Sequence, residues 1–195
     1  MMRLKNAFVP GLFAIMIIAG MIFAVDGPAE EQNVPFPSYG SGPVEVRLYS
    51  DYFCPPCRAV EPVVEPILKD LLEKKVIRLT LVDTPFHTYT PLYARYFLYA
   101  LKENNEVDHA FRVRKILIKA STNKSITTKE QIEAIFKEEG IPYAVFDVKP
   151  AFDGYNVLLK EDNIKSTPTC VIVKNGQKRS FLGGTDIINA LKSLQ

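Results

Sequence analysis

Two cysteines, Cys54 and Cys57, stand where a strand pattern changes into a helix pattern. Residues 44–50 are mostly β-branched or large apolar residues, which indicates a buried strand. From Ala59 onward, apolar residues recur at helical spacing. The sequence therefore predicts that Cys54 lies at a helix N-terminus, where free N–H groups and the positive end of the helix dipole favour a thiolate. Cys57 follows one turn later, close enough to form a disulfide with Cys54.

This arrangement predicts different roles for the two thiols. Cys54 should be exposed and should ionise more readily, because a helix N-terminus stabilises negative charge over its first turn only. Cys57 should be shielded and should react slowly. A CxxC pair can also be half of a zinc site, but the sequence has no second such pair and only two histidines. We therefore expect neither a metal nor another cofactor.

The charge balance argues against a nucleic-acid partner. Of the 24 Lys and Arg residues, two precede Asp26, which leaves 22 basic residues against 22 acidic ones in the rest of the chain. A nucleic-acid-binding domain would instead carry a basic patch or stripe. With 47% hydrophobic and 24% charged residues, the chain is apolar enough for one folded domain, and long enough for a targeting segment as well.

The first 25 residues have the pattern of a targeting segment. Arg3 and Lys5 precede an uncharged stretch, Ala7–Val25, which as a helix would span roughly 28 Å, about the thickness of the hydrocarbon core. An uncleaved signal anchor and a cleaved signal peptide both fit residues 1–25. We expect the anchor, because Phe23–Val25 matches a cleavage site poorly. Either form places the rest of the chain on the extracytoplasmic or periplasmic face of the membrane, since the positive residues stay in the cytoplasm.

The remaining chain divides into a tether and one domain. Residues 26–43, rich in Pro and Gly, predict a flexible tether, and residues 44–195 predict an α/β domain. Strands are expected at 76–82, 169–174 and 178–182, with a hairpin turn at Asn175–Gly176. Helices are expected at 91–103, 107–120, 152–161 and at the C-terminus. A further helix is expected to begin at a capping box, Thr127–Glu130, and to end at Gly140. Pro62 and Pro66 should interrupt the first helix and kink it.

Two motifs in this domain resemble the thioredoxin superfamily, and within it the DsbA-type thiol:disulfide oxidoreductases. One is Cys54-Pro55-Pro56-Cys57 after a strand, and the other is Thr167-Pro168-Thr169 before a strand. The helices of about 90–162 look like the helical insertion of that group, placed between the second and third core strands. The resemblance thus implies a thioredoxin-like fold with a helical insertion, preceded here by the N-terminal membrane helix.

The resemblance also implies an activity. Cys54 and Cys57 would form a redox-active disulfide, and a cis Pro168 would face Cys54. Thr167, Pro168, Pro55 and Pro56 would contact the substrate. The enzyme would form disulfides in reduced or unfolded exported proteins, and a membrane redox partner would reoxidise it. Two alternatives stay open: a reductase of the same fold, for example one serving cytochrome maturation, and a non-catalytic module that binds peptides beside Pro168.

Two positions depart from the family pattern. Pro55-Pro56 stands where many members carry a histidine between the cysteines. Leu48 stands where many thioredoxin-fold enzymes carry a buried carboxylate. The proton acceptor for Cys57 is therefore either water or a nearby polar group.

Three further residues have structural interpretations. We expect Asp51 to cap the helix that follows it. His87 is expected to be a structural or surface residue rather than part of the active site. Cys170, in an apolar strand, is expected to be a buried and inert thiol.

Overall fold

The computed structural model describes residues 36–195. The predicted membrane segment, residues 1–25, and the first part of the predicted tether lie outside this range. Among residues 36–195, no helix combines the length and the apolar character that crossing a membrane requires.

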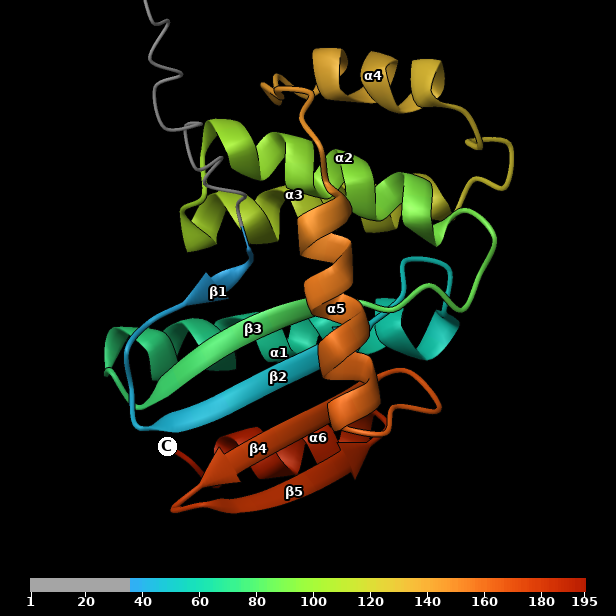
Figure 1. Ribbon diagram of the computed structural model, residues 1–195. Coiled ribbons are helices and arrows are strands. Elements are labelled where there is room, and N and C mark those ends of the chain that lie inside the picture. The colour runs from blue at the N-terminus through green and yellow to red at the C-terminus, as the bar shows by residue number, and fades with distance from the viewer. Residues whose placement is uncertain (1–35) are drawn as a thin grey trace, which may run out of the picture. The chain divides into compact units, whose positions relative to one another are not determined.

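A five-stranded mixed sheet forms the centre of this domain, with the strand order β1-β3-β2-β4-β5 (Figure 1). The strands are β1 (Ser38–Tyr39), β2 (Val44–Ser50), β3 (Ile77–Asp83), β4 (Thr169–Lys174) and β5 (Gln177–Leu182). β2 and β3 are parallel, and the other neighbouring strands are antiparallel. Every residue of β2 except Glu45 is buried, and its apolar residues Val44, Val46, Leu48 and Tyr49 all belong to the hydrophobic core.

Helices cover both faces of the sheet. α1 (Pro55–Glu73) and α6 (Gly184–Lys192) pack on one face, and α5 (Lys149–Glu161) crosses the other (Figure 1). α2 (Thr90–Glu103), α3 (Val107–Ser121) and α4 (Lys129–Glu138) form a separate helical block. Helices α2–α5 thus lie between β3 and β4 in the chain, at the place where the sequence predicts the insertion. The result is a thioredoxin-like α/β fold.

Ion pairs hold the end of α5 against the sheet. Arg47 Nη1 and Lys178 Nζ bind the carboxylate of Asp162, at 3.0 and 2.6 Å. The Tyr49 hydroxyl donates a hydrogen bond to the same carboxylate at 2.5 Å. These contacts fix the chain just before the loop that carries Thr167 and Pro168.

The structure corrects the predicted tether. Residues 36–43 belong to the folded domain, because Ser38–Tyr39 pairs with β3 and Tyr39 is buried. The Gly42 N–H also donates to the Ile77 carbonyl at 3.0 Å. A two-residue strand has no periodicity that a sequence pattern could show, so only its tertiary partner β3 defines it.

Two predicted helix features are also corrected. α1 is one continuous helix across Pro62 and Pro66, so the predicted interruption is wrong, whereas the kink stays a prediction. Both prolines face solvent, where carbonyls that lose an amide partner can bind water. The capping box of α4 lies one residue later than predicted, since Gln131 Oε1 accepts from the Thr128 N–H at 3.0 Å. The predicted turn at Asn175–Gly176 is confirmed, and both residues have positive φ angles.

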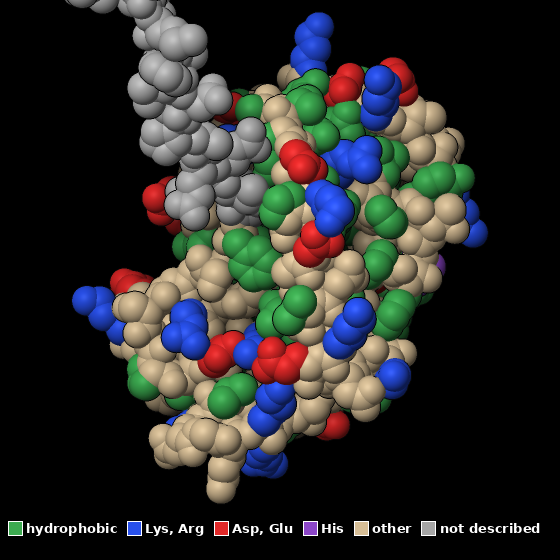
Figure 2. Space-filling view, viewed as in Figure 1, with side chains coloured by type: hydrophobic (Ala, Val, Ile, Leu, Met, Phe, Trp, Pro, Cys, Tyr) green, Lys and Arg blue, Asp and Glu red, His purple; other side chains and the backbone are tan. Residues whose placement is uncertain are grey.

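The surface carries charges of both signs. Figure 2 shows Lys and Arg side chains interspersed with Asp and Glu over the face that α5 crosses. A continuous basic surface is not present on this face, in keeping with the balanced charge of the sequence after residue 25.

Candidate active site

The CxxC motif lies just after the carboxyl end of β2. Cys54 is the N-cap of α1 with an extended backbone, φ −78° and ψ 115°, and the helix begins at Pro55. Proline suits the first helical position, because its φ is preset and its missing N–H would have no intrahelical partner there. The Cys54 N–H donates to the Asp51 carbonyl, and the Arg58 N–H donates to the Cys54 carbonyl, both at 3.1 Å. These bonds hold Cys54 between a turn and the helix.

The two thiols of the motif differ in burial less than predicted. Cys54, Cys57 and Cys170 are all free thiols. Cys54 is 6% exposed and Cys57 is 0% exposed, so the prediction of an exposed Cys54 is wrong for this state, although Cys57 is the more deeply buried. The cause is a contact with a distant loop. Cys54 Sγ donates to the Thr167 carbonyl at 3.3 Å, and this contact covers the sulfur.

The loop that contacts Cys54 contains the predicted cis proline. The Thr167–Pro168 bond is cis, which confirms the prediction. Because Tyr49 in β2 lies opposite Thr169 in β4, the residues just before β4 fall beside the end of β2 and therefore beside Cys54. Pro168 is buried and Thr167 half-buried.

The dipeptide between the cysteines changes how α1 can stabilise charge. Pro55 and Pro56 are both exposed and neither has an N–H group. The Arg58 N–H is already bonded to the Cys54 carbonyl. The helix start therefore offers fewer free N–H donors to a Cys54 thiolate than the sequence-based argument assumed.

Cys57 and Cys170 are buried, and burial makes both thiols harder to ionise. It raises the pKa of Cys57 to about 12, and it raises the pKa of Cys170 to about 12 as well. Cys170 is fully buried opposite Leu48, which confirms the prediction of a buried thiol. Both groups therefore stay protonated near neutral pH.

Asp51 has a different role from the one predicted. Its side chain does not cap α1 but joins the active-site turn to the loop between β3 and α2. Asp51 Oδ1 accepts from the Phe53 N–H and the Thr90 hydroxyl, both at 2.8 Å. Oδ2 accepts from the N–H groups of Phe86 and His87, both at 3.1 Å, and lies 3.0 Å from His87 Nδ1. The predicted cap is wrong because these groups occupy the carboxylate.

The thioredoxin-like fold described above agrees with comparisons to known proteins. The family described as thioredoxin matches residues 39–181. The chain belongs to the thioredoxin family. Within this family it is similar to the thiol:disulfide interchange protein DsbA of Bordetella pertussis, with 26% identity over 171 residues that cover 82% of this chain and 78% of that protein. This similarity supports a DsbA-type thiol:disulfide oxidoreductase.

Solved structures of other thioredoxin-like proteins share the fold. A periplasmic thioredoxin-like protein from Salmonella enterica serovar Typhimurium has a TM-score of 0.61 and 18% identity, over 82% of this chain and 87% of that chain. The catalytic domain of Proteus mirabilis ScsC has a TM-score of 0.60 and 18% identity, over 84% of this chain and 89% of that chain. At these identities the likeness concerns the fold.

This thioredoxin-family domain also contains a buried ion cluster. Arg114 of α3 binds Glu61 of α1 through two contacts, Nε–Oε2 at 3.0 Å and Nη2–Oε1 at 2.8 Å. Arg114 Nη1 also binds Asp83 Oδ1 at 2.7 Å, and the Tyr52 hydroxyl donates to Asp83 Oδ2 at 3.0 Å. The Ser50 hydroxyl donates to Glu61. All five residues are buried, and burial raises the pKa of Asp83 although Arg114 opposes this shift. The cluster ties the active-site helix to the helical insertion.

The cluster was not predicted from the sequence, although one signal for it exists. Arg114 follows Phe111 by three residues and precedes Leu117 by three, so it lies on the apolar face of its helix. An arginine at such a position needs a buried carboxylate partner. The sequence cannot say which acid that is.

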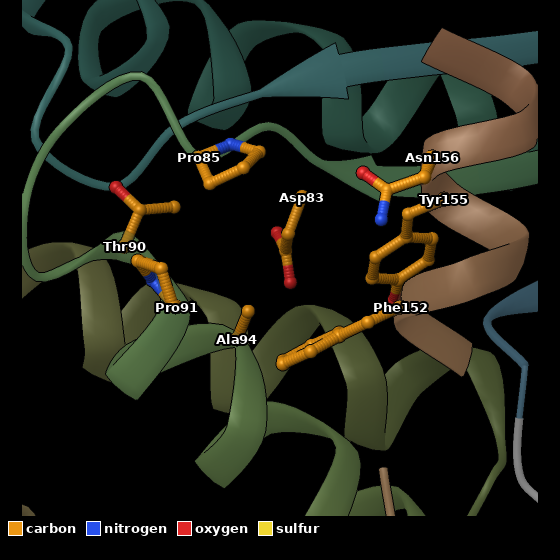
Figure 3. A pocket seen from close by; sticks show the side chains of 8 residues that line it. All are labelled: Asp83, Pro85, Thr90, Pro91, Ala94, Phe152, Tyr155 and Asn156. Atoms are coloured by element: carbon orange, nitrogen blue, oxygen red, sulfur yellow. The ribbon is translucent and has the colours of Figure 1, made fainter. Parts of the chain in front are cut away.

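A small cavity lies next to this cluster. Figure 3 shows Asp83 facing Phe152 and Tyr155 of α5, with Ala94 of α2 on another side, around a cavity of about 100 Å³. The Tyr155 hydroxyl is buried and has no hydrogen-bond partner within the described residues. Neither Cys54 nor Cys57 lines the cavity, so we assign it no part in the thiol chemistry.

The burial of the thiols predicts their order of alkylation. In the reduced native protein between pH 7 and 9, we expect iodoacetamide to label Cys54 first, and Cys57 and Cys170 only after unfolding. The reactive form is the thiolate, and the two raised pKa values keep Cys57 and Cys170 protonated over this range. Mass spectrometry of proteolysed, labelled protein measures the order, and the urea-unfolded protein is the control. Early labelling of Cys57 would contradict the expectation.

Proposed function

We propose that the protein forms disulfides in exported proteins through the Cys54–Cys57 pair. The observation that carries the proposal is the position of Cys54, at the N-cap of α1 and 3.3 Å from the carbonyl of Thr167, beside Pro168. A client chain that approaches Cys54 meets Pro55 and Pro56 on one side and the Thr167–Pro168 loop on the other. We propose that these four residues contact the substrate. The thiol:disulfide interchange relatives support this reading.

The reaction starts from the oxidised pair. A client thiolate attacks Cys54 Sγ, because Cys54 is the less buried residue of the two. The Cys54–Cys57 bond breaks, its electron pair leaves with the Cys57 sulfur, and a disulfide joins Cys54 to the client. A second client thiolate then attacks the client sulfur of this bond. The client disulfide forms, Cys54 leaves as a thiolate, and two electrons have passed from the client to the protein.

Cys57 must take up a proton as it leaves. Burial raises its pKa to about 12, so a Cys57 thiolate is unstable where it forms. Leu48 provides no carboxylate at the position that many family members use. Water or a nearby polar group therefore supplies the proton in this proposal.

We place this reaction on the extracytoplasmic or periplasmic face of the membrane, with residues 1–25 as an anchor and a membrane redox partner that accepts the two electrons. The basic and then apolar pattern of the first 25 residues supports this location, and one structural relative is itself described as periplasmic. Intact-mass measurement of the protein from a membrane fraction tests the anchor, because a start near residue 25 would exclude it.

The direction of the reaction follows from the redox potential. Proteins of this fold range from about −270 mV for a reductant to about −120 mV for an oxidant, and the proposed oxidase activity requires the Cys54/Cys57 couple to lie nearer the second value. The measurement is equilibration with glutathione, with Cys170→Ala as the matched control. A value near −270 mV would favour the reductase. Insulin reduction that persists in a Cys54→Ser variant would show that the pair is not the redox centre.

A further inference from the structure

An open hollow of about 550 Å³ lies directly against the CxxC motif. Three segments form its walls: residues 53–58 at the start of α1, residues 87–89 between β3 and α2, and residues 121–124 after α3. We call it the cationic hollow, because Arg58 and Lys124 lie on two of its three walls.

The cationic hollow and the Thr167–Pro168 loop lie on opposite flanks of Cys54. β2 ends just before the motif and lies between β3 and β4 in the sheet. The residues that follow β3 contribute to the hollow, whereas the residues that precede β4 form the cis-proline loop. A client joined to Cys54 therefore has a second surface available, on the side away from Pro168.

The walls of the hollow are held in place before any client binds. The Phe53 ring packs edge-on against Tyr93 with centroids 4.8 Å apart, and lies 6.1 Å from the Tyr89 ring. Arg58 Nη1 donates to the Ser121 carbonyl at 3.4 Å. The bonds to Asp51 fix the loop that carries His87. An apolar and aromatic floor thus lies beside the two cations.

The positive charge of the hollow is not neutralised. No Asp or Glu is among the residues that line it, and neither Arg58 nor Lys124 forms an ion pair with any residue from 36 to 195. The carboxylate of Asp51 is fully buried behind the loop and already occupied. In contrast, Arg47, Arg114 and Lys178 each bind carboxylates. Half-buried arginine with unused donors matches the planar geometry of a carboxylate.

We propose that the cationic hollow binds an acidic side chain of the client polypeptide, close in sequence to the cysteine that bonds to Cys54. Apolar or aromatic neighbours of that acid would pack on Phe53 and Tyr89. The proposal rests on the function proposed above and specifies its substrate class. Clients with a carboxylate near the reacting cysteine would then be oxidised in preference to neutral ones.

The test uses reduced peptides with one cysteine pair and a single Glu that is moved from three residues before to three residues after the first cysteine. Each has a partner peptide with Gln at the same place. We expect kcat/KM for the best Glu peptide to exceed that of its Gln partner by roughly three- to tenfold. This ratio lies between the effect expected of an exposed charge pair and that expected of a buried one. The ratio should fall as NaCl is raised from 50 to 500 mM, because salt screens the contact.

Variants of Arg58 and Lys124 test whether these two residues cause the preference for Glu peptides. In an Arg58→Gln/Lys124→Gln variant, the Glu to Gln ratio should fall to about one, whereas Lys160→Gln, an exposed charge on α5, should leave it unchanged. Lys124→Glu should reverse the preference toward a peptide with Lys at the same position. This last variant changes only an exposed side chain, so it guards against misfolding of the double variant.

The outcomes separate this proposal from the proposed function. If wild-type protein oxidises all peptides equally, the acidic-client proposal is wrong and the redox function stands. If no peptide is oxidised, the redox function is wrong. Binding of labelled peptides with Ser in place of Cys then still tests whether the hollow binds an acidic side chain. A lower Kd for the Glu peptide than for the Gln peptide supports the acidic-client proposal only if Arg58→Gln/Lys124→Gln removes the difference. Equal Kd values for the two peptides overturn the proposal.

Discussion

Replacing Cys57 with alanine is expected to leave client proteins covalently bound to Cys54. The mixed disulfide can escape through attack by Cys57, and the variant lacks that thiol. Cys54→Ala should trap nothing, because Cys57 is fully buried and its pKa is raised to about 12. Non-reducing electrophoresis of both variants, purified from the compartment in which they act, measures the adducts.

Cys170→Ala is the control for this experiment. Cys170→Ala should behave like the wild type, since Cys170 is buried in β4 opposite Leu48. If only Cys54→Ala traps clients, the roles of the two thiols are reversed. If neither variant traps any, the oxidoreductase proposal fails.

Replacing Arg114 with leucine is expected to lower the free energy of unfolding by about 3–5 kcal/mol. The substitution leaves Glu61 and Asp83 buried without the guanidinium that both contact, and an uncompensated buried charge is costly. Urea unfolding of reduced protein, followed by circular dichroism, gives the midpoint and the free energy. Since the cluster joins α1 to the insertion, the variant tests how strongly these two parts depend on each other.

Arg78→Leu is the matched control. Arg78 is an exposed residue that pairs with Glu45 at 3.0 Å, and exposed pairs contribute at most about 1 kcal/mol. A second variant, Arg114→Leu with Glu61→Gln and Asp83→Asn, should recover part of the loss because it removes the stranded charges. A loss for Arg114→Leu no larger than that for Arg78→Leu would show that the cluster is not important for stability.

Much of the active site is local in sequence and could be predicted from it. A buried strand, the residues Cys54 to Cys57 and a helix follow each other within one continuous segment. The position of Cys54 at the helix start depends only on the propensities of its neighbours. The hairpin at Asn175–Gly176 is local for the same reason, since those two residues accept positive φ angles.

Other features depend on contacts between distant segments. The family resemblance implied that Pro168 faces Cys54. It did not imply the bond from Cys54 to the carbonyl of Thr167, 113 residues later, and the low exposure of Cys54 was therefore not foreseen. Asp51 seemed suited to cap the helix, but loop N–H groups 35 and 36 residues away took its carboxylate. In each case one polar group had several possible partners.

The sequence by itself therefore determined which sulfur stands at the start of α1 and which lies one turn inside it. The tertiary structure decided which groups surround those sulfurs. It brought β1 into the sheet beside β3 and paired Arg114 with acids from two other elements. Around the cationic hollow, Arg58 and Lys124 form no ion pair with any described residue. The physical reason is that local propensity acts through neighbouring residues. Which buried charges pair, and which stay free, depends on the groups that meet when folding excludes water.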